Sequence, residues 1–537
     1  MSRKFSTAFT QLSAIVNKYD GASTLLKSNL LGKLAGMALP SGQSLLDYHD
    51  SLLFLCAYPD NPAILRLAER GLQSIARYAK QHRGNDTLVP ENEGLPFANT
   101  VTRFSPDFLR WLDGHKDLKV EFDSFYNPSL NLNAILNITL PATLKAETTA
   151  GLDNEALLTV LHIPPADYVP FILGQLETLQ ELPILKELFI ERMDLYVKLV
   201  PQHVQFSRAY NRVPIAATYY HQDLLKQFDP VQLIKQPLAD TRFPDWEEKQ
   251  VLYKAIRNAM ALTVREIDPA TFLQTATIRC YDLERGLSLS VYSMIPKHQL
   301  PLETYFGFTF FKNGIPISYG GIWAFGPMAK IGLNIFEAFR GGESGYLLCQ
   351  LMRVMKQTMG VTYVEMEPYQ YGLDNPGGIA SGAFWFYYKY GFRPVDGSLK
   401  ELAQQEYHKI KTRKNYRSTE KTLLRFTESN IGVNLGDTIP VSVADITTKI
   451  LLLIKKNWQH NYAPAKQAAM EQFCSQVELG MSELDADASK VLEDIALWAM
   501  AMKVRQLPQL QLMRQMVLTK TKDDYAYQQL LLDFFKM

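Results

Sequence analysis

Four side chains in the central part of the chain could together move protons: Tyr387, Glu337, Glu365 and Glu367. A phenol can donate a proton to a departing thiolate, and a carboxylate can accept one from an attacking amine, directly or through water. Glu365 and Glu367 fall on one face of a predicted strand, and Glu337 follows the end of another. Each residue also has a structural interpretation, because aromatic clusters pack sheets and strand-end carboxylates form ion pairs.

A glycine-rich turn lies close to these residues. Residues 340–345 read Arg-Gly-Gly-Glu-Ser-Gly, after an alternating strand and before a predicted helix. Free N–H groups at a helix N-terminus and the helix dipole both favour an anion such as a phosphate. Ser344 could equally cap the helix without any ligand. The predicted cofactor-binding set is Ile335, Phe336, Arg340, Gly341, Gly342, Glu343, Ser344 and Gly345.

These features, in this order, resemble the acyl-CoA-binding core of the GNAT superfamily of N-acyltransferases. That family ends its fourth strand with Arg/Gln-x-x-Gly-x-Gly/Ala, which residues 340–345 match with Glu343 in place of the usual first glycine. Ala380 stands where the family often has Asn. The family's later Ala-x-x-x-Tyr-x-x-x-Gly-Phe pattern matches without a gap at Ala383, Tyr387, Gly391 and Phe392.

The resemblance implies a V-shaped opening between the fourth and fifth strands, where pantetheine lies, with the pyrophosphate on the amides of the turn. It implies acetyl-CoA or another acyl-CoA as co-substrate, no metal, and Tyr387 as the general acid. Glu343 is an unusual neighbour for a pyrophosphate, so the direction of its side chain decides whether CoA fits. The acceptor would be a small-molecule or peptide amine, in a pocket shaped by the N-terminal region and the 369–382 loop.

The surrounding pattern predicts the elements that would position these residues. Asn313-Gly314 lies between two β-prone runs and predicts a tight hairpin, because both turn positions need φ > 0. A helix is expected from Ser344 to a C-terminal glycine at Gly360. A strand should follow at residues 361–368, and a strand–helix–strand unit favours parallel neighbours.

The whole chain is therefore expected to be an α/β protein with a mixed sheet. A GNAT-like domain at 261–400 should be flanked by a mixed, mainly helical region at 1–260 and a helical region at 431–537. Residues 401–430 are rich in Lys and Arg and predict a basic linker. Within the N-terminal region, residues 118–122 and 132–140 show β-like alternation.

Composition limits the classes of protein. A chain of 537 residues should hold more than one domain, and its net charge of +1 argues against a protein that coats nucleic acid. The four cysteines lie far apart and form no Cys-x-x-Cys, which favours a reduced, cytoplasmic protein without structural zinc. No stretch approaches 18 uninterrupted apolar residues, so no membrane span is expected.

Two other functions remain open. The basic run at 409–425 is compatible with a transferase that uses an aminoacyl-tRNA donor on a GNAT-like fold, in which case tRNA would be a partner. Alternatively, a degenerate core with Glu343 in the phosphate turn could serve as a scaffold for protein partners.

Overall fold

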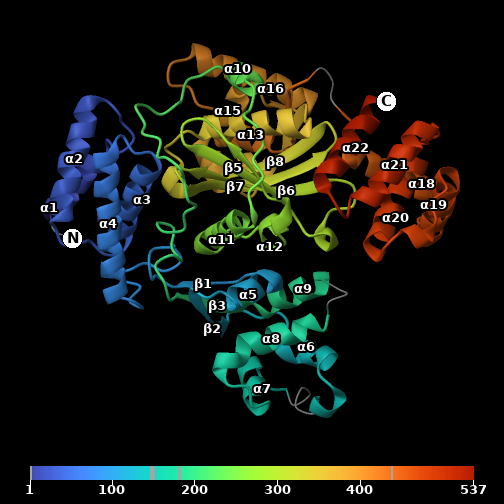
Figure 1. Cartoon of the computed structure of the whole chain (residues 1–537), viewed down its shortest axis with the longest axis horizontal. Helices are drawn as coiled ribbons and strands as arrows, with labels where there is room; N and C mark the ends of the chain where they lie inside the picture. Colours follow the sequence, from blue (N-terminus) through green and yellow to red (C-terminus); the bar gives the residue numbers. More distant parts are fainter. Residues whose placement is uncertain (1–2, 146–150, 180–182, 437–439) are drawn as a thin grey trace.

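The computed structural model describes residues 3–145, 151–179, 183–436 and 440–537. At its centre is an eight-stranded sheet with the order β10-β11-β9-β8-β7-β6-β5-β4 (Figure 1). Strands β8 and β9 pair in parallel, and the other neighbours are antiparallel. The chain is thus a mixed α/β protein, as predicted. The strands are β4 (Arg279–Asp282), β5 (Leu287–Ser293), β6 (Thr304–Lys312), β7 (Ile315–Phe325), β8 (Met328–Ile335), β9 (Tyr363–Met366), β10 (Arg393–Pro394) and β11 (Ile431–Asn434).

The predicted hairpin joins β6 to β7. Asn313 and Gly314 have φ of 47° and 77°, the left-handed region that the two turn positions require. The Asn313 side chain donates hydrogen bonds to the carbonyls of Ala57 and Tyr219, so the hairpin tip is fixed to the N-terminal region. The hairpin prediction is confirmed.

The strand–helix–strand unit is also confirmed. Helix α13 (Ser344–Met359) follows β8 and ends at Gly360, whose φ of 67° is accessible to glycine at little cost. Strand β9 then returns parallel to β8. Helix α13 is buried along most of its length, since its apolar side chains pack against the sheet. After β9 come α14 (Pro376–Ser381) and α15 (Ala383–Lys389), with the short helix η7 (Pro368–Tyr371) before them.

The N-terminal region begins with four helices, at the left in Figure 1. A second part holds a small sheet of order β1-β3-β2, with helices packed beside it. The elements are α1 (Arg3–Ser13), α2 (Gly21–Ala35), α3 (Gln43–Ala57), α4 (Pro62–Gln81), β1 (Thr100–Thr102), α5 (Pro106–Asp113), β2 (Leu118–Phe125), α6 (Leu132–Thr139), α7 (Asn154–Val160), α8 (Tyr168–Glu177), α9 (Pro183–Met193) and β3 (Leu195–Pro201).

One predicted strand in this region is wrong. Residues 118–125 do form strand β2, but residues 132–139 form helix α6. Leu132, Ile135 and Leu136 are all fully buried, at the i, i+3, i+4 spacing of one helix face. The same residues also satisfy a short alternating pattern, and tertiary packing decides between the two.

The expected boundary at 260 falls inside a helix. Helix α11 (Trp246–Thr263) runs past that position, and its buried face packs against β7. Asp245 begins it by accepting the N–H of Glu248, and Val264 ends it in the left-handed region with φ of 52°. Two short helices flank it, α10 (Pro230–Lys235) and α12 (Asp268–Thr271).

The predicted basic linker at 401–430 is wrong for most of its length. It contains most of α16 (Gly397–Thr412) and all of α17 (Glu420–Phe426), followed by β11 of the main sheet. The Glu406 carboxylate is buried and accepts hydrogen bonds from Lys409, Tyr416 and Ser418, which holds the connection between the helices. The apolar face of this segment was not evident from the sequence, because the buried residues Leu423 and Phe426 lie among exposed Lys and Arg.

The C-terminal part is a bundle of five helices, at the right in Figure 1: α18 (Val443–Trp458), α19 (Tyr462–Val477), α20 (Ala486–Ala501), α21 (Leu507–Thr519) and α22 (Asp524–Lys536). Helix α22 fixes it to the sheet. Gln528 accepts the N–H of Gly326 and donates to the carbonyls of Gly326 and Met359. Within the described ranges, no single helix has the length and apolar character to cross a membrane; the bent pair at 154–160 and 165–177 meets that standard only jointly.

Candidate functional site

Strands β8 and β9 separate at the end of the sheet. Their parallel pairing covers three residue pairs and ends at Lys330 and Glu365. Strand β8 continues to Ile335, whereas the chain after β9 turns into η7. The Gln370 side chain from η7 accepts the N–H of Leu333, which β9 would otherwise satisfy. Beyond Lys330, the edge of β8 is therefore contacted by a side chain of η7 instead of the backbone of β9.

A cavity of about 950 Å³ lies at this separation. Its walls come from β8 and the turn after it, from the first residue of α13, and from α15. The segment after α11 and parts of the N-terminal region close it. Six residues of the predicted site line it: Ile335, Phe336, Glu337, Arg340, Ser344 and Tyr387. The other six are not among its lining residues: Gly341, Gly342, Glu343, Gly345, Glu365 and Glu367.

The start of α13 and the turn before it contribute Arg340 and Ser344 to the cavity wall. Arg340 is exposed, and its Nε lies 3.4 Å from the carbonyl oxygen of Ile335, so most of the guanidinium is free to bind a ligand. Ser344 does not cap the helix; its hydroxyl donates to the Arg340 carbonyl. The first N–H groups of α13 have no acceptor within the helix, because that is inherent to a helix start.

The glycines of the turn serve packing more than ligand contact. The N–H of Gly342 donates to the Phe339 carbonyl, so it is not available to a phosphate. A Cβ on Gly345 would lie 1.7 Å from the Tyr390 hydroxyl. Gly341 is different, since a Cβ there meets nothing within 4 Å. The turn is thus held close to its neighbours on one side and open on the other.

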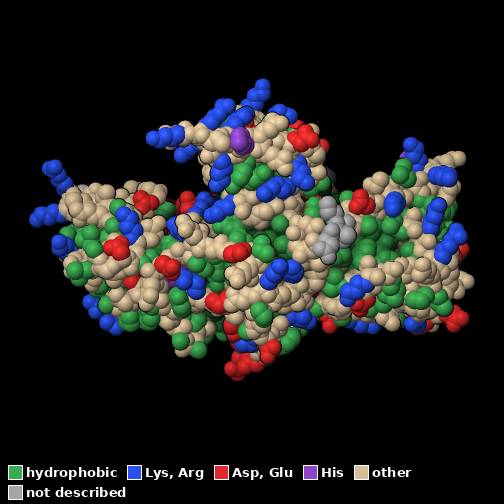
Figure 2. All heavy atoms as spheres, turned by 90° about the horizontal axis from the view of Figure 1, so that it is seen from above, with side chains coloured by type: hydrophobic (Ala, Val, Ile, Leu, Met, Phe, Trp, Pro, Cys, Tyr) green, Lys and Arg blue, Asp and Glu red, His purple; other side chains and the backbone are tan. Residues whose placement is uncertain are grey.

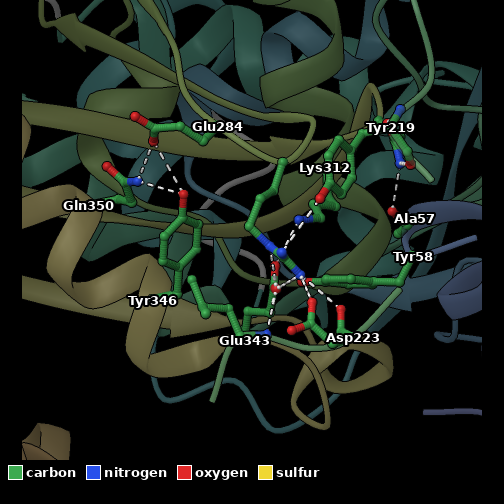
Figure 3. Close-up of polar contacts among 12 residues, drawn as sticks. Ala57, Tyr58, Tyr219, Asp223, Glu284, Lys312, Glu343, Tyr346 and Gln350 are labelled. Carbon is green, nitrogen blue, oxygen red and sulfur yellow. Dashed lines mark hydrogen bonds and ion pairs between the residues drawn. The ribbon is translucent and has the colours of Figure 1, made fainter. Parts of the chain in front are cut away.

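Glu343 points away from the cavity. Figure 3 shows its side chain close to those of Lys312, Tyr58 and Asp223. It accepts the N–H of Leu225 at 2.9 Å, Nε of Arg285 at 3.0 Å and Nζ of Lys312 at 2.7 Å. Its charge is neutralised there. The concern that it opposes a pyrophosphate therefore does not apply to this arrangement.

The same cluster fixes the turn to distant parts of the chain. Arg285 also donates to both the carbonyl and the carboxylate of Asp223. Lys312 lies over the ring of Tyr58, with 4.8 Å between Nζ and the ring centroid. Burial lowers the pKa of Lys312 to about 8, although the Glu343 carboxylate acts to raise it.

Tyr387 lies in the cavity wall on α15. Its side chain is 6% exposed, and burial raises its pKa above the ordinary range of a phenol. A phenol in this state remains protonated at neutral and alkaline pH. Its edge-to-face contacts with Phe386 and Phe392 give the ring a packing role in the same wall.

The three glutamates separate into two groups. Glu337, in the short helix η6 (Glu337–Phe339), is exposed and lines the cavity. Glu365 accepts a hydrogen bond from Asn430 and lines a separate small cavity of about 120 Å³. Glu367 forms an ion pair with Lys330 at 3.1 Å. Of the three, Glu337 is the one that the structure brings to the same cavity as Tyr387.

Sequence reasoning missed several residues of the cavity wall. Arg208 and Glu93 come from the N-terminal region, and Arg265 and Glu266 follow α11. Arg208 is held by Asp50, with 2.7 Å between Nη2 and Oδ1. Val264, beside Arg265, has φ of 52°, which a β-branched residue rarely adopts, but this conformation is evident only in the fold and gave the sequence no signal.

The described residues offer neither a metal site nor a reactive thiol. No group of three or more His, Cys, Asp or Glu side chains in the described ranges could hold a metal ion. Burial raises the pKa values of Cys56 and Cys280 to about 11 and that of Cys349 to about 12, so these thiols stay protonated. Cys474 is partly exposed and lies in the C-terminal bundle. Of the residues expected from the sequence to transfer protons, Tyr387 and Glu337 are the two that line this cavity.

Comparison with known proteins gave no match among family models, curated proteins or solved structures.

Proposed function

We propose that this protein is an acyl-CoA-dependent N-acyltransferase with a GNAT-like core at the β8–β9 separation. The observation that carries the proposal is the pairing of β8 with β9, which stops after three residue pairs beside a cavity of about 950 Å³. The free edge of a strand can pair with the amides of a pantetheine chain. The start of α13, with Arg340, lies at the same cavity and can take the pyrophosphate.

The chemistry follows from the residues in the wall. The amine nitrogen attacks the thioester carbonyl carbon, and the carbon–sulfur bond breaks as the amide forms. The departing thiolate takes a proton from Tyr387, and the amine gives its proton to Glu337, directly or through water. The two side chains then return to their starting states by exchange with solvent. Glu365 and Glu367, which the sequence also indicated, have no part in this scheme.

Calorimetric titration of the full chain with acetyl-CoA and with CoA tests the proposal. Native protein should bind both. Arg340→Ala should weaken binding by about tenfold or more, because it removes a charge-assisted contact. Ser344→Glu should abolish binding by placing a negative charge beside the phosphates, whereas the matched Ser344→Ala should bind almost as native protein does.

Circular dichroism and melting curves would show that each variant is folded. Failure of the native, folded protein to bind either ligand would contradict the proposal and favour the scaffold function.

A second candidate function, transfer from an aminoacyl-tRNA, is favoured by one surface. Seen from above, Lys and Arg side chains gather on a projecting part of the molecule over the α15–α16 region (Figure 2). The exposed basic residues of α16, α17 and the connection between these helices are Lys400, Lys411, Arg413, Lys414, Arg417, Lys421 and Arg425. The buried Glu406 holds the connection between α16 and α17, so these cations are displayed on a folded surface.

Fluorescence anisotropy with labelled tRNA at several salt concentrations distinguishes the two functions. A donor tRNA should bind with an affinity that falls steeply with salt, and the triple variant K411E/R413E/K414E should lose that binding. Absence of salt-dependent binding would exclude tRNA as the donor and leave acyl-CoA.

A further inference from the structure

The cavity wall extends beyond the residues assigned to the proposed donor. The proposed donor would occupy the part lined by Arg340, Ser344 and Tyr387. The remaining wall is formed by the segment after α11 and by residues of the N-terminal region. Its charged residues are Glu93, Arg208, Arg265 and Glu266. Because the donor carries the acyl group, the acceptor amine would lie at this part of the wall.

Arg265 and Arg208, the two cations of this part of the wall, differ in their interactions. Its side chain is exposed and has no ion-pair or hydrogen-bond partner among the described residues. Arg208, by contrast, already donates to both oxygens of Asp50 and to the Glu93 carbonyl. A guanidinium in a cavity wall without a partner is suited to bind a carboxylate, since its N–H groups match the two oxygens.

The backbone holds Arg265 in this position. Val264 ends α11 with φ of 52°, and the N–H of Arg265 donates to the carbonyl of Met260 at 3.0 Å. This closed turn directs residues 265–267 into the cavity wall. Tyr319 lies in the same wall, and Arg265 opposes the rise that burial causes in its pKa, which places the guanidinium near that phenol.

The carboxylates of the cavity complete the pattern. Glu93 and Glu337 are exposed in its wall and have no cationic partner among the described residues. Glu266 is held by Ser105 and Thr271, so it belongs to the framework. A cavity whose wall carries both an exposed guanidinium and exposed carboxylates is complementary to a small zwitterion.

We propose that the acceptor is a small amine that also carries a carboxylate, such as a free amino acid, and that Arg265 binds that carboxylate. This inference rests on the proposed function, because it assigns the acceptor part of the same cavity. Arg265 would then select amino acids over simple amines, and Glu337 would face the amine that attacks the thioester.

The first experiment compares matched acceptors. Thiol release from acetyl-CoA is measured with a panel of free amino acids and with their carboxamides. The acids should be preferred in kcat/KM by about tenfold or more, and Arg265→Gln should remove the preference through a higher KM. The control Arg505→Gln, at an exposed position of the C-terminal region, should keep it. Equal rates for acid and amide, or an unaffected R265Q variant, would overturn the inference.

A second experiment does not depend on turnover. Arg265 should react with phenylglyoxal, and mass spectrometry should show that the free amino acids protect it while their carboxamides do not. Equal protection by both, or none, would overturn the inference. Protection in a protein that does not bind CoA would keep the carboxylate site and reject the acyl-CoA donor, so the two failures are distinguishable.

Discussion

Lys312 Nζ lies 2.7 Å from Glu343 Oε2, and the two side chains are 0% and 1% exposed. Lys312 is the last residue of β6, and Glu343 immediately precedes α13. The pair therefore joins the tip of the β6–β7 hairpin to the turn that lines the cavity. It also explains how a carboxylate can follow Gly341-Gly342 without lining the cavity.

Breaking this pair should destabilise the protein strongly. Lys312→Met leaves the Glu343 carboxylate with Arg285 as its one cationic partner and should lower the free energy of unfolding by about 3 kcal/mol. Chemical denaturation measures this change. Lys330→Met is the matched control, because its ion pair with Glu367 is partly exposed and should contribute less than about 1 kcal/mol.

A double-mutant cycle separates the interaction energy of Lys312 and Glu343 from the cost of each substitution by itself. Lys312→Met combined with Glu343→Gln should cost less than the sum of the single changes, because the second substitution removes the stranded charge. Additive costs would show that the two side chains do not interact in solution.

The pH dependence of stability should report Lys312. Burial lowers its pKa from the ordinary 10.5 to about 8, so between these values the unfolded chain binds more protons than the folded protein. Stability from this group therefore rises as pH increases from 8 to 10.5, by on the order of 3 kcal/mol in full. The measured quantity is the difference between native protein and Lys312→Met, because buried tyrosines also titrate there. A difference that does not change over this range would contradict the assignment.

The local elements of the core could be predicted from the sequence because their signals are local. Asn313-Gly314 specifies a turn through φ > 0 at two adjacent positions, and Gly360 ends α13 for the same reason. The cavity wall could not be predicted in this way. Arg208 and Arg265 reach it from parts of the chain that meet the sheet only in the folded structure. Long-range packing leaves no pattern within a short window.

For the site residues too, the sequence indicated local features but not the long-range contacts. The turn at 340–345 was found through its glycines, but two of them serve packing against Tyr58 and Tyr390. The cationic partners of Glu343 lie 31 and 58 residues before it in the sequence. Nothing in the local sequence indicates that its carboxylate is neutralised, so its role could be understood only from the fold.

Replacement of Tyr387 should separate binding from chemistry. Tyr387→Phe keeps the ring contacts of α15 and should leave the Kd for CoA unchanged. It should lower kcat by about 100-fold to 10,000-fold, because the proton donor to the thiolate is lost. Rates are measured by thiol release at saturating acetyl-CoA. Since burial raises the pKa of Tyr387, native activity should persist above pH 10, and an unchanged kcat in the variant would remove Tyr387 from the reaction.

The glutamates predicted as bases can be distinguished by three matched substitutions. Glu337→Gln should lower kcat at neutral pH by about 100-fold, with partial recovery at alkaline pH where more of the amine is already deprotonated. Glu365→Gln and Glu367→Gln should each leave kcat within about twofold, because neither lines the cavity. If kcat fell further in Glu365→Gln or Glu367→Gln than in Glu337→Gln, Glu337 would not be the general base.

Substitution by alanine should change the stability of the protein strongly at one glycine near the cavity and hardly at another. A Cβ on Gly320 of β7 would lie 1.8 Å from the carbonyl oxygen of Gly332, which is backbone and cannot move aside without shifting β8. Gly320→Ala should therefore lower the melting temperature severely or prevent folding, at a cost of more than about 4 kcal/mol. Gly341→Ala meets nothing within 4 Å and should leave stability within about 1 kcal/mol. Because Gly341 lies in the turn before α13, titration of the folded G341A variant with CoA also tests the anion site. Unchanged stability in G320A would show that β7 and β8 do not pack as described.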